Sequence, residues 1–140
     1  MAADFIYLAS PYTHTSSIIR EQRYKKACRA AARLMLEGYN VFCPIAHSHP
    51  IALEIPDYAT NGPFWKKQDV PILRHASRLM VLTIDGWDTS SGIKWEIDLA
   101  RNLHMPVEYI KDTGNDEDEI ADASGSLIRM VSRAGNAIRV

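Results

Sequence analysis

The alternation of short apolar runs with longer amphipathic stretches constrains the fold more than any other feature of the sequence. The apolar runs are rich in strand-forming residues and cover residues 5–9, 39–43, 79–84 and 105–110. Helical spacing of apolar residues predicts helices from Ser16 or Ser17 toward Gly38, over 64–76, and from Ser90 or Ser91 onward. Such strand–helix–strand units have right-handed crossovers and a parallel sheet covered on both faces. We therefore predict a three-layer, flavodoxin-like or Rossmann-like α/β fold with strand order 2-1-3-4.

Length and composition favour one domain. The chain has 140 residues, of which 46% are hydrophobic and 24% are charged, and these values are typical of a single globular domain. We place its core at about residues 4–111. The remainder, 112–140, begins with an acidic run that indicates a solvated loop and continues with a weak helical pattern.

The near-neutral charge and the lack of recognisable targeting segments argue against several classes of partner. The net charge of -1 gives no field that gathers a nucleic acid polymer or an anionic membrane. No apolar run approaches the roughly 18 residues of a membrane span, and residues 1–4 lack the basic start of a signal peptide. Cys28 and Cys43 form neither a disulfide framework nor a paired metal motif, so we expect buried thiols in a reducing cytoplasm.

Glu96 is the side chain that fits its predicted surroundings least. A helix that starts near Ser90 has one apolar stripe, and Glu96 falls inside it. The stripe consists of Ile93, Ile97, Leu99, Ala100 and Leu103. Burying a carboxylate is costly unless something compensates it. We expect the field of the helix N-terminus to keep Glu96 ionised, as a nucleophile or base; the alternative is a structural glutamate paired with an arginine or a tyrosine.

The turn before this helix carries groups that bind a phosphate or a sugar hydroxyl. Ser90 supplies a hydroxyl, and Gly92 supplies a free backbone N–H at a helix start whose dipole favours negative charge. We take Asp88, Ser90 and Gly92 as candidate substrate-binding residues. The alternative is that Asp88 or Ser90 only caps the helix.

Asp69 and Tyr7 are candidate partners of Glu96. Asp69 shares a face of the second predicted helix with Trp65. Two carboxylates on helices that flank one strand suit cleavage of a glycosidic bond, although Asp69 could instead cap a helix around Pro71. The Tyr7 phenol lies in the first predicted strand and either orients Glu96 or belongs to the core. Trp65 either stacks on a nucleobase or packs against its neighbours.

The connection 45–63 is long enough to be a lid or a binding loop. His47 and His49 lie two residues apart in it, but no third ligand has the spacing of a metal site, so we predict no metal. His47 is a candidate for substrate contact, and a solvated loop histidine is the alternative. We expect no cofactor, because the carboxylates can do this chemistry alone.

The order of these motifs resembles the nucleoside 2-deoxyribosyltransferase-like family, including its deoxynucleoside 5′-monophosphate N-glycosidase branch. The resemblance covers roughly residues 5 to 110 and is carried by Tyr7, Asp69 and the segment 90–96 that ends in Glu96. A bacterial and phage branch looks closest, because it shares the loop Ser10, Pro11 and Tyr12 and the pair Gly86 and Trp87. Ser10 and Pro11 are thus further candidates for substrate contact.

The resemblance implies that Glu96 attacks C1′ of a nucleoside or nucleoside 5′-monophosphate and forms a glycosyl-enzyme. It implies that Asp69 protonates the departing base, that Tyr7 positions Glu96, and that Ser90 with Gly92 holds the 5′ group. It also implies a homodimer or larger homo-oligomer with a small-molecule substrate. Water or a second base would then release the sugar, with net retention.

The sequence departs from the family pattern at three places. Lys94 replaces the second glycine of the turn, Ser77 stands where relatives often have an acid, and 45–63 has no counterpart. The mode of 5′ recognition and the base are therefore not carried over. Because a fold does not fix a function, a non-catalytic nucleotide-binding or sensing module is the second hypothesis.

Overall fold

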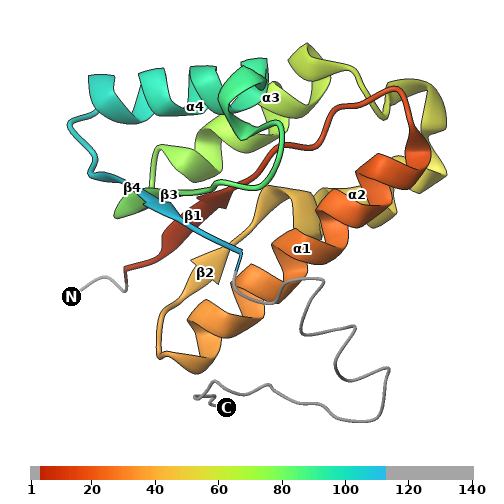
Figure 1. Cartoon of the computed structure of the whole chain (residues 1–140). Coiled ribbons are helices and arrows are strands. Elements are labelled where there is room, and N and C mark those ends of the chain that lie inside the picture. Colours follow the sequence, from red (N-terminus) through yellow and green to blue (C-terminus); the bar gives the residue numbers. More distant parts are fainter. Residues whose placement is uncertain (1–3, 113–140) are drawn as a thin grey trace, which may run out of the picture.

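The structure, a computed structural model, describes residues 4–112 (Figure 1). The strands are β1 (Ile6–Ala9), β2 (Val41–Phe42), β3 (Arg78–Leu82) and β4 (Val107–Ile110). The α-helices are α1 (Ser17–Leu36), α2 (Pro44–Glu54), α3 (Gly62–Leu73) and α4 (Ser91–Asn102), and two 3-10 turns are η1 (Pro56–Tyr58) and η2 (Trp87–Thr89). The predicted acidic loop and C-terminal helix lie outside the described residues, except for Asp112.

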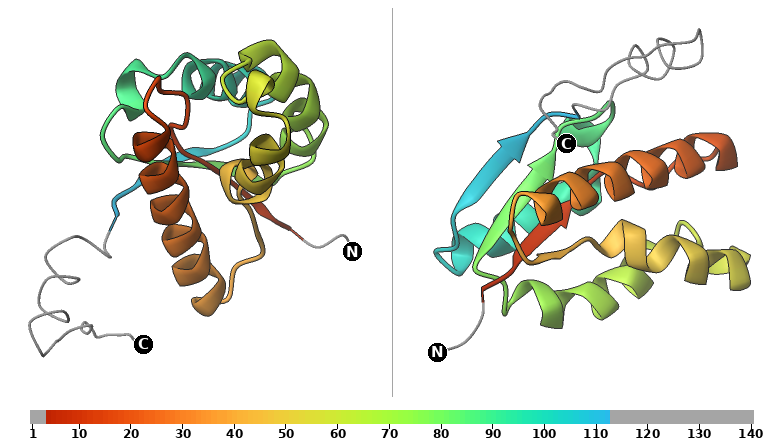
Figure 2. Two further views of the ribbon diagram at one scale, coloured as in Figure 1. Left: turned by 90° about the vertical axis from the view of Figure 1, so that its right-hand side faces the viewer. Right: turned by 90° about the horizontal axis from the view of Figure 1, so that it is seen from below.

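The strands form one parallel sheet in the order β2-β1-β3-β4, which confirms the predicted topology. Helices α1 and α2 cover one face, and α3 and α4 cover the other (Figure 1). The left-hand view of Figure 2 shows the same layers, with α4 above the strands and α1 below them. Alternating residues of β1 serve the two cores: Leu8 packs with α1, whereas Tyr7 packs with α3 and α4. Parallel sheets are usually buried in this way on both faces.

Local signals account for where α1 begins and ends and for where α4 begins. The hydroxyls of Ser16 and Ser90 accept hydrogen bonds from backbone N–H groups in the first turns of α1 and α4, as N-cap residues do. Gly38 follows α1 with a φ of 103°, and glycine adopts this left-handed conformation without strain. These predicted boundaries are confirmed.

The prediction that 45–63 is a long loop was wrong. The segment contains α2 and η1. Pro44 occupies the first turn of α2, where its fixed φ favours a helix and its missing N–H costs nothing. Pro50 lies inside the helix, and such a proline normally argues against helix, which is why periodicity alone did not reveal α2.

The predicted inner face of α1 was also displaced by about one residue. The helical spacing of five residues predicts that Tyr24, Cys28, Ala31, Ala32 and Met35 share one inner face, but Ala32 and Met35 are exposed. The buried residues of α1 are Ala27, Ala30, Ala31 and Leu34. In the part of the chain that the structure describes, none of the helices is long and apolar enough to cross a membrane.

Candidate active site

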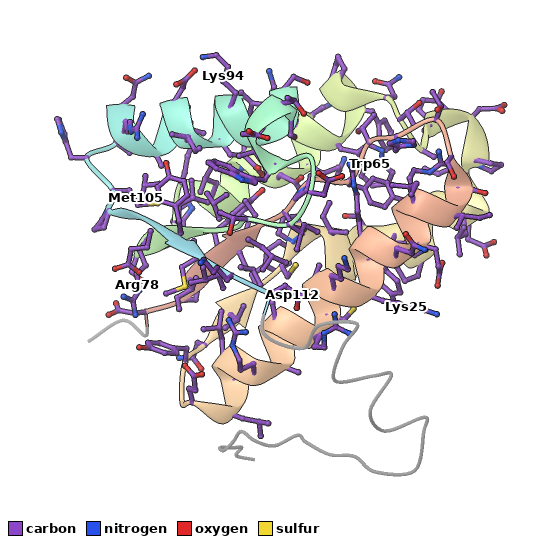
Figure 3. The ribbon with its side chains drawn as sticks, viewed as in Figure 1. Lys25, Trp65, Arg78, Lys94, Met105 and Asp112 are labelled. Atoms are coloured by element: carbon purple, nitrogen blue, oxygen red, sulfur yellow. The ribbon has the colours of Figure 1, made fainter. Side chains whose placement is uncertain are left out.

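A pocket of about 560 Å³ opens where the carboxyl ends of β1 and β3 meet the helices. Its walls come from the connection after β1, from α1, α2, α3 and α4, and from the segment around η2. Ligands of open α/β sheets bind at this edge. Figure 3 shows Trp65 on the inner side of α3 and Lys94 on the outer side of α4. Of these two side chains, Trp65 lines the pocket and Lys94 does not.

Glu96 lines this pocket and is almost fully buried, with 7% of its surface exposed. The Tyr7 hydroxyl donates a hydrogen bond to Glu96 Oε2 at 2.6 Å. No hydrogen bond to Glu96 Oε1 occurs among the described residues. The inward position predicted for Glu96 is confirmed, and its carboxyl keeps one oxygen for a ligand.

Burial dominates the electrostatics of the site. It raises the pKa of Glu96 to about 8, against the Tyr7 hydrogen bond, which lowers this pKa; the nearby Asp69 charge raises it further. Our expectation that the helix field keeps Glu96 ionised was therefore wrong for the free protein at pH 7, because desolvation outweighs it. Burial also raises the pKa of Tyr7, so the phenol keeps the proton that it donates.

Asp69 lines the same pocket from α3, and burial raises its pKa to about 6. At a pH between about 6 and about 8, the carboxyl groups of Asp69 and Glu96 together hold a single proton. Two interacting carboxyls titrate as a pair in this way. The pair can thus supply one carboxylate and one carboxylic acid at neutral pH. Burial raises the pKa of the nearby Cys43 thiol to about 12, so this cysteine stays protonated.

Ser10, Trp65, Ser90 and Gly92, four of the predicted substrate-binding residues, line the pocket. Ser10 Oγ is buried and has no hydrogen-bond partner among the described residues, which is unusual for a buried hydroxyl and suits a ligand contact. The Trp65 ring is held in place because its indole N–H donates to the carbonyl oxygen of Tyr58 at 2.8 Å.

Pro11, His47 and Asp88, the other predicted substrate-binding residues, do not line the pocket. Pro11 is buried, whereas Asp88 and His47 are exposed. His47 points away because α2 is helical: residues two apart on a helix face directions roughly 200° apart. His49 lies on the pocket side instead and lines the pocket.

The sequence did not reveal Tyr12, Arg23, Lys66 and Trp95 as pocket residues. Arg23 donates to the carbonyl oxygens of Thr13 at 3.0 Å and Asp85 at 3.3 Å. It therefore joins the connections that follow β1 and β3. The Lys66 ammonium lies 5.0 Å from the centre of the Trp95 ring. Arg23 was not predicted because the apolar spacing places it away from the predicted inner face of α1, and no local pattern in the sequence brings Lys66 next to Trp95.

Residues 4–112 contain no group of three or more His, Cys, Asp or Glu side chains arranged to hold a metal ion. The model of a protein family, DUF1937, described as a domain of unknown function, matches residues 4–112. This match includes every residue of the pocket. A comparison with curated proteins finds no match.

Proposed function

The chain belongs to the DUF1937 family, whose description assigns no activity, and we propose that it cleaves the bond between base and sugar in a nucleoside or nucleoside 5′-monophosphate. One observation carries the proposal: Glu96 is buried, is held by Tyr7, and shares a pocket with Asp69. An acid is rarely buried with a single neutral partner unless it has a chemical role. The overlap of this arrangement with the motifs named above supports the same conclusion.

The proposed reaction is a double displacement. Glu96 attacks C1′, so that a bond between its carboxylate oxygen and C1′ forms while the bond between C1′ and the base nitrogen breaks. Asp69 gives its proton to the leaving base. Water or a second base then attacks C1′ and gives a proton to the Asp69 carboxylate, while the bond between C1′ and Glu96 breaks; the sugar leaves with net retention.

The single proton shared by Glu96 and Asp69 suits this chemistry. In the reactive form the proton lies on Asp69 and Glu96 is ionised. The Tyr7 O–H stabilises the Glu96 carboxylate through the hydrogen bond to Oε2, and the positive charge that develops at C1′ stabilises it further. Bound substrate therefore favours the ionised form of Glu96, which burial disfavours in the free protein.

The pocket also suits the rest of a nucleotide. Its volume of about 560 Å³ lies within the range of small-molecule sites, roughly 300 to 1,000 Å³. Trp65 and Trp95 both line it and offer faces for a base. Ser10 Oγ and the backbone N–H groups at the start of α4 offer hydrogen bonds to the 5′ group.

Incubation with a panel of nucleosides and nucleoside 5′-monophosphates, followed by chromatography of free bases, tests the proposal. We expect release of free base by the wild-type protein. A substrate with fluorine at C2′ slows release of the glycosyl-enzyme, and peptide mass spectrometry should then find the added sugar on Glu96. If nucleotides raise the melting temperature but no base appears with any of them, the protein is a non-catalytic binding module instead.

A further inference from the structure

A second cluster of polar side chains lies on the other side of the pocket from the carboxyl pair. His49, on α2, is 5% exposed and lines the pocket together with Tyr12. Its Nδ1 lies 2.7 Å from the Tyr12 hydroxyl, and its Nε2 lies 2.9 Å from a carboxylate oxygen of Glu21. The imidazole also stacks on the Tyr24 ring, with 4.3 Å between ring centres. We call Tyr12, Glu21, Tyr24 and His49 the histidine cluster.

When the imidazole of His49 is neutral, the Glu21 carboxylate fixes the direction of the hydrogen bonds in the histidine cluster. An ionised carboxylate only accepts hydrogen bonds, so His49 Nε2 carries a hydrogen and donates it to Glu21. In a neutral imidazole the other nitrogen, Nδ1, is then an acceptor. The Tyr12 hydroxyl then donates its only hydrogen to Nδ1, and its oxygen can accept from a donor in the pocket as well as from the nearby Arg20 guanidinium.

We propose that Glu21 and His49 position the Tyr12 hydroxyl as a hydrogen-bond acceptor in the pocket, and that this acceptor selects ligands with a hydrogen-bond donor at that place. The inference rests on the proposed function for the class of ligand, a nucleotide, but the direction of the hydrogen bonds is independent of it. In a nucleotide such a donor is a sugar hydroxyl, or an amino group or ring N–H of the base. A ligand that presents only an acceptor there leaves two acceptors facing each other, which is unfavourable.

Nitrogen NMR of histidine-labelled protein tests the direction of the hydrogen bonds without any ligand. Spectra of wild type and His49→Gln identify the His49 signals, and His47→Gln is the matched control because His47 is exposed on the same helix. We expect His49 to carry its hydrogen on Nε2 at neutral pH. A hydrogen on Nδ1, or on both nitrogens, overturns the proposal.

Calorimetric binding to pairs of nucleotides that differ by one donor tests the selection. One pair is 2′-deoxyadenosine and 2′,3′-dideoxyadenosine 5′-monophosphate, which removes the 3′-hydroxyl. The other replaces adenine by purine, which removes the amino group. In the wild type we expect one pair to differ in Kd by about fivefold or more, and we expect Tyr12→Phe to abolish that difference. The pair that responds identifies the donor.

Glu21→Lys reverses the proposed hydrogen-bond direction while the phenol stays in place. A lysine only donates, so His49 Nε2 becomes the acceptor, Nδ1 carries the hydrogen, and the Tyr12 hydroxyl is free to donate. We expect this variant to lose the difference in Kd as Tyr12→Phe does. Glu54→Lys makes the same change of charge at an exposed position of α2 and should retain the difference.

The outcomes separate this inference from the proposed function. If base is released but neither pair distinguishes wild type from Tyr12→Phe, or if Glu21→Lys leaves the difference intact, the selection is disproved and the hydrolase stands. If one pair differs in Kd and both Tyr12→Phe and Glu21→Lys abolish the difference, but no base is released, the selection by Tyr12 is supported and the proposed base-releasing activity is disproved. If neither pair binds to the wild-type protein, the selection of nucleotides is overturned as well.

Discussion

The two sides of the pocket bury polar groups in opposite ways. On the α1 and α2 side, both ring nitrogens of His49 have hydrogen-bond partners within the protein. On the α3 and α4 side, Glu96 has one bonded oxygen, and burial raises its pKa to about 8. A buried group whose hydrogen bonds are complete orients its neighbours, whereas a buried acid with one neutral partner destabilises the free protein. This difference supports the two proposals, in which the histidine cluster positions a ligand and Glu96 reacts with it.

Replacing Glu96 is the most severe test of this contrast. Glu96→Gln keeps the shape of the side chain and an oxygen that accepts from Tyr7, but it removes the nucleophile. We expect kcat/KM for base release to fall about 10³-fold or more, with an unchanged circular dichroism spectrum. Asp98→Asn, at an exposed position of α4, is the control. Wild-type rates in Glu96→Gln would show that Glu96 is merely structural.

Replacing Asp69 tests whether the two acids of the pocket have different roles. Asp69→Asn removes the proton donor, so turnover should fall about 10²-fold for bases that need protonation to leave. The loss should be about tenfold or less for 7-methylguanine, which leaves without being protonated. Asp57→Asn, an exposed residue of η1, serves as control. Equal losses for all bases would remove the acid role from Asp69.

The positions of the strands and both ends of α1 followed from local rules, because apolar runs, serine caps and Gly38 act over a few residues. The strand order then followed from the usual connection of strand–helix–strand units. The helix α2 did not follow from local rules, because Pro50 argues against a helix locally and the packing of the buried Ala52 and His49 overrides it. Tertiary contacts decide such cases, and they are not visible in periodicity.

The same division holds for the site. Glu96 could be found because a carboxyl inside an apolar stripe contradicts its surroundings within one helix, and functional sites are where such rules fail. His49 could not be distinguished from His47, because the distinction depends on α2 being a helix. The chain from Glu21 through His49 to Tyr12 joins three separate segments, and nothing in the sequence pairs them.

The pH dependence of stability sharpens the contrast between the two sides. Burial raises the pKa of Glu96 from 4.5 to about 8, so between these values the folded protein binds a proton that the unfolded chain releases. Stability then falls as pH rises through this window. Glu96→Gln lacks this loss and should be more stable than wild type by about 2 to 4 kcal/mol at pH 8, but not at pH 4. Urea denaturation at both pH values measures this, and an equal effect at both contradicts the burial of an ionisable acid.

The smallest effect concerns Gly86, where the two sides of the pocket are joined. Gly86 has a φ of 94°, and a Cβ there would overlap Arg23 Nη2. Arg23 comes from α1 and donates to the carbonyl oxygen of Asp85, so Gly86→Ala should strain the backbone and displace the guanidinium. We expect a loss of about 1 to 2 kcal/mol in unfolding free energy.

Gly38→Ala provides the matched control, because Gly38 has a similar φ of 103° and a Cβ there would meet nothing within 4 Å. Gly38→Ala therefore loses only the free energy of placing alanine at a positive φ, with no steric overlap. We expect Gly86→Ala to lower the free energy of unfolding more than Gly38→Ala does. In an Arg23→Ala background that excess should disappear, since two substitutions in contact are not additive. An excess that persists without the guanidinium would show that Arg23 does not join the two sides through this contact.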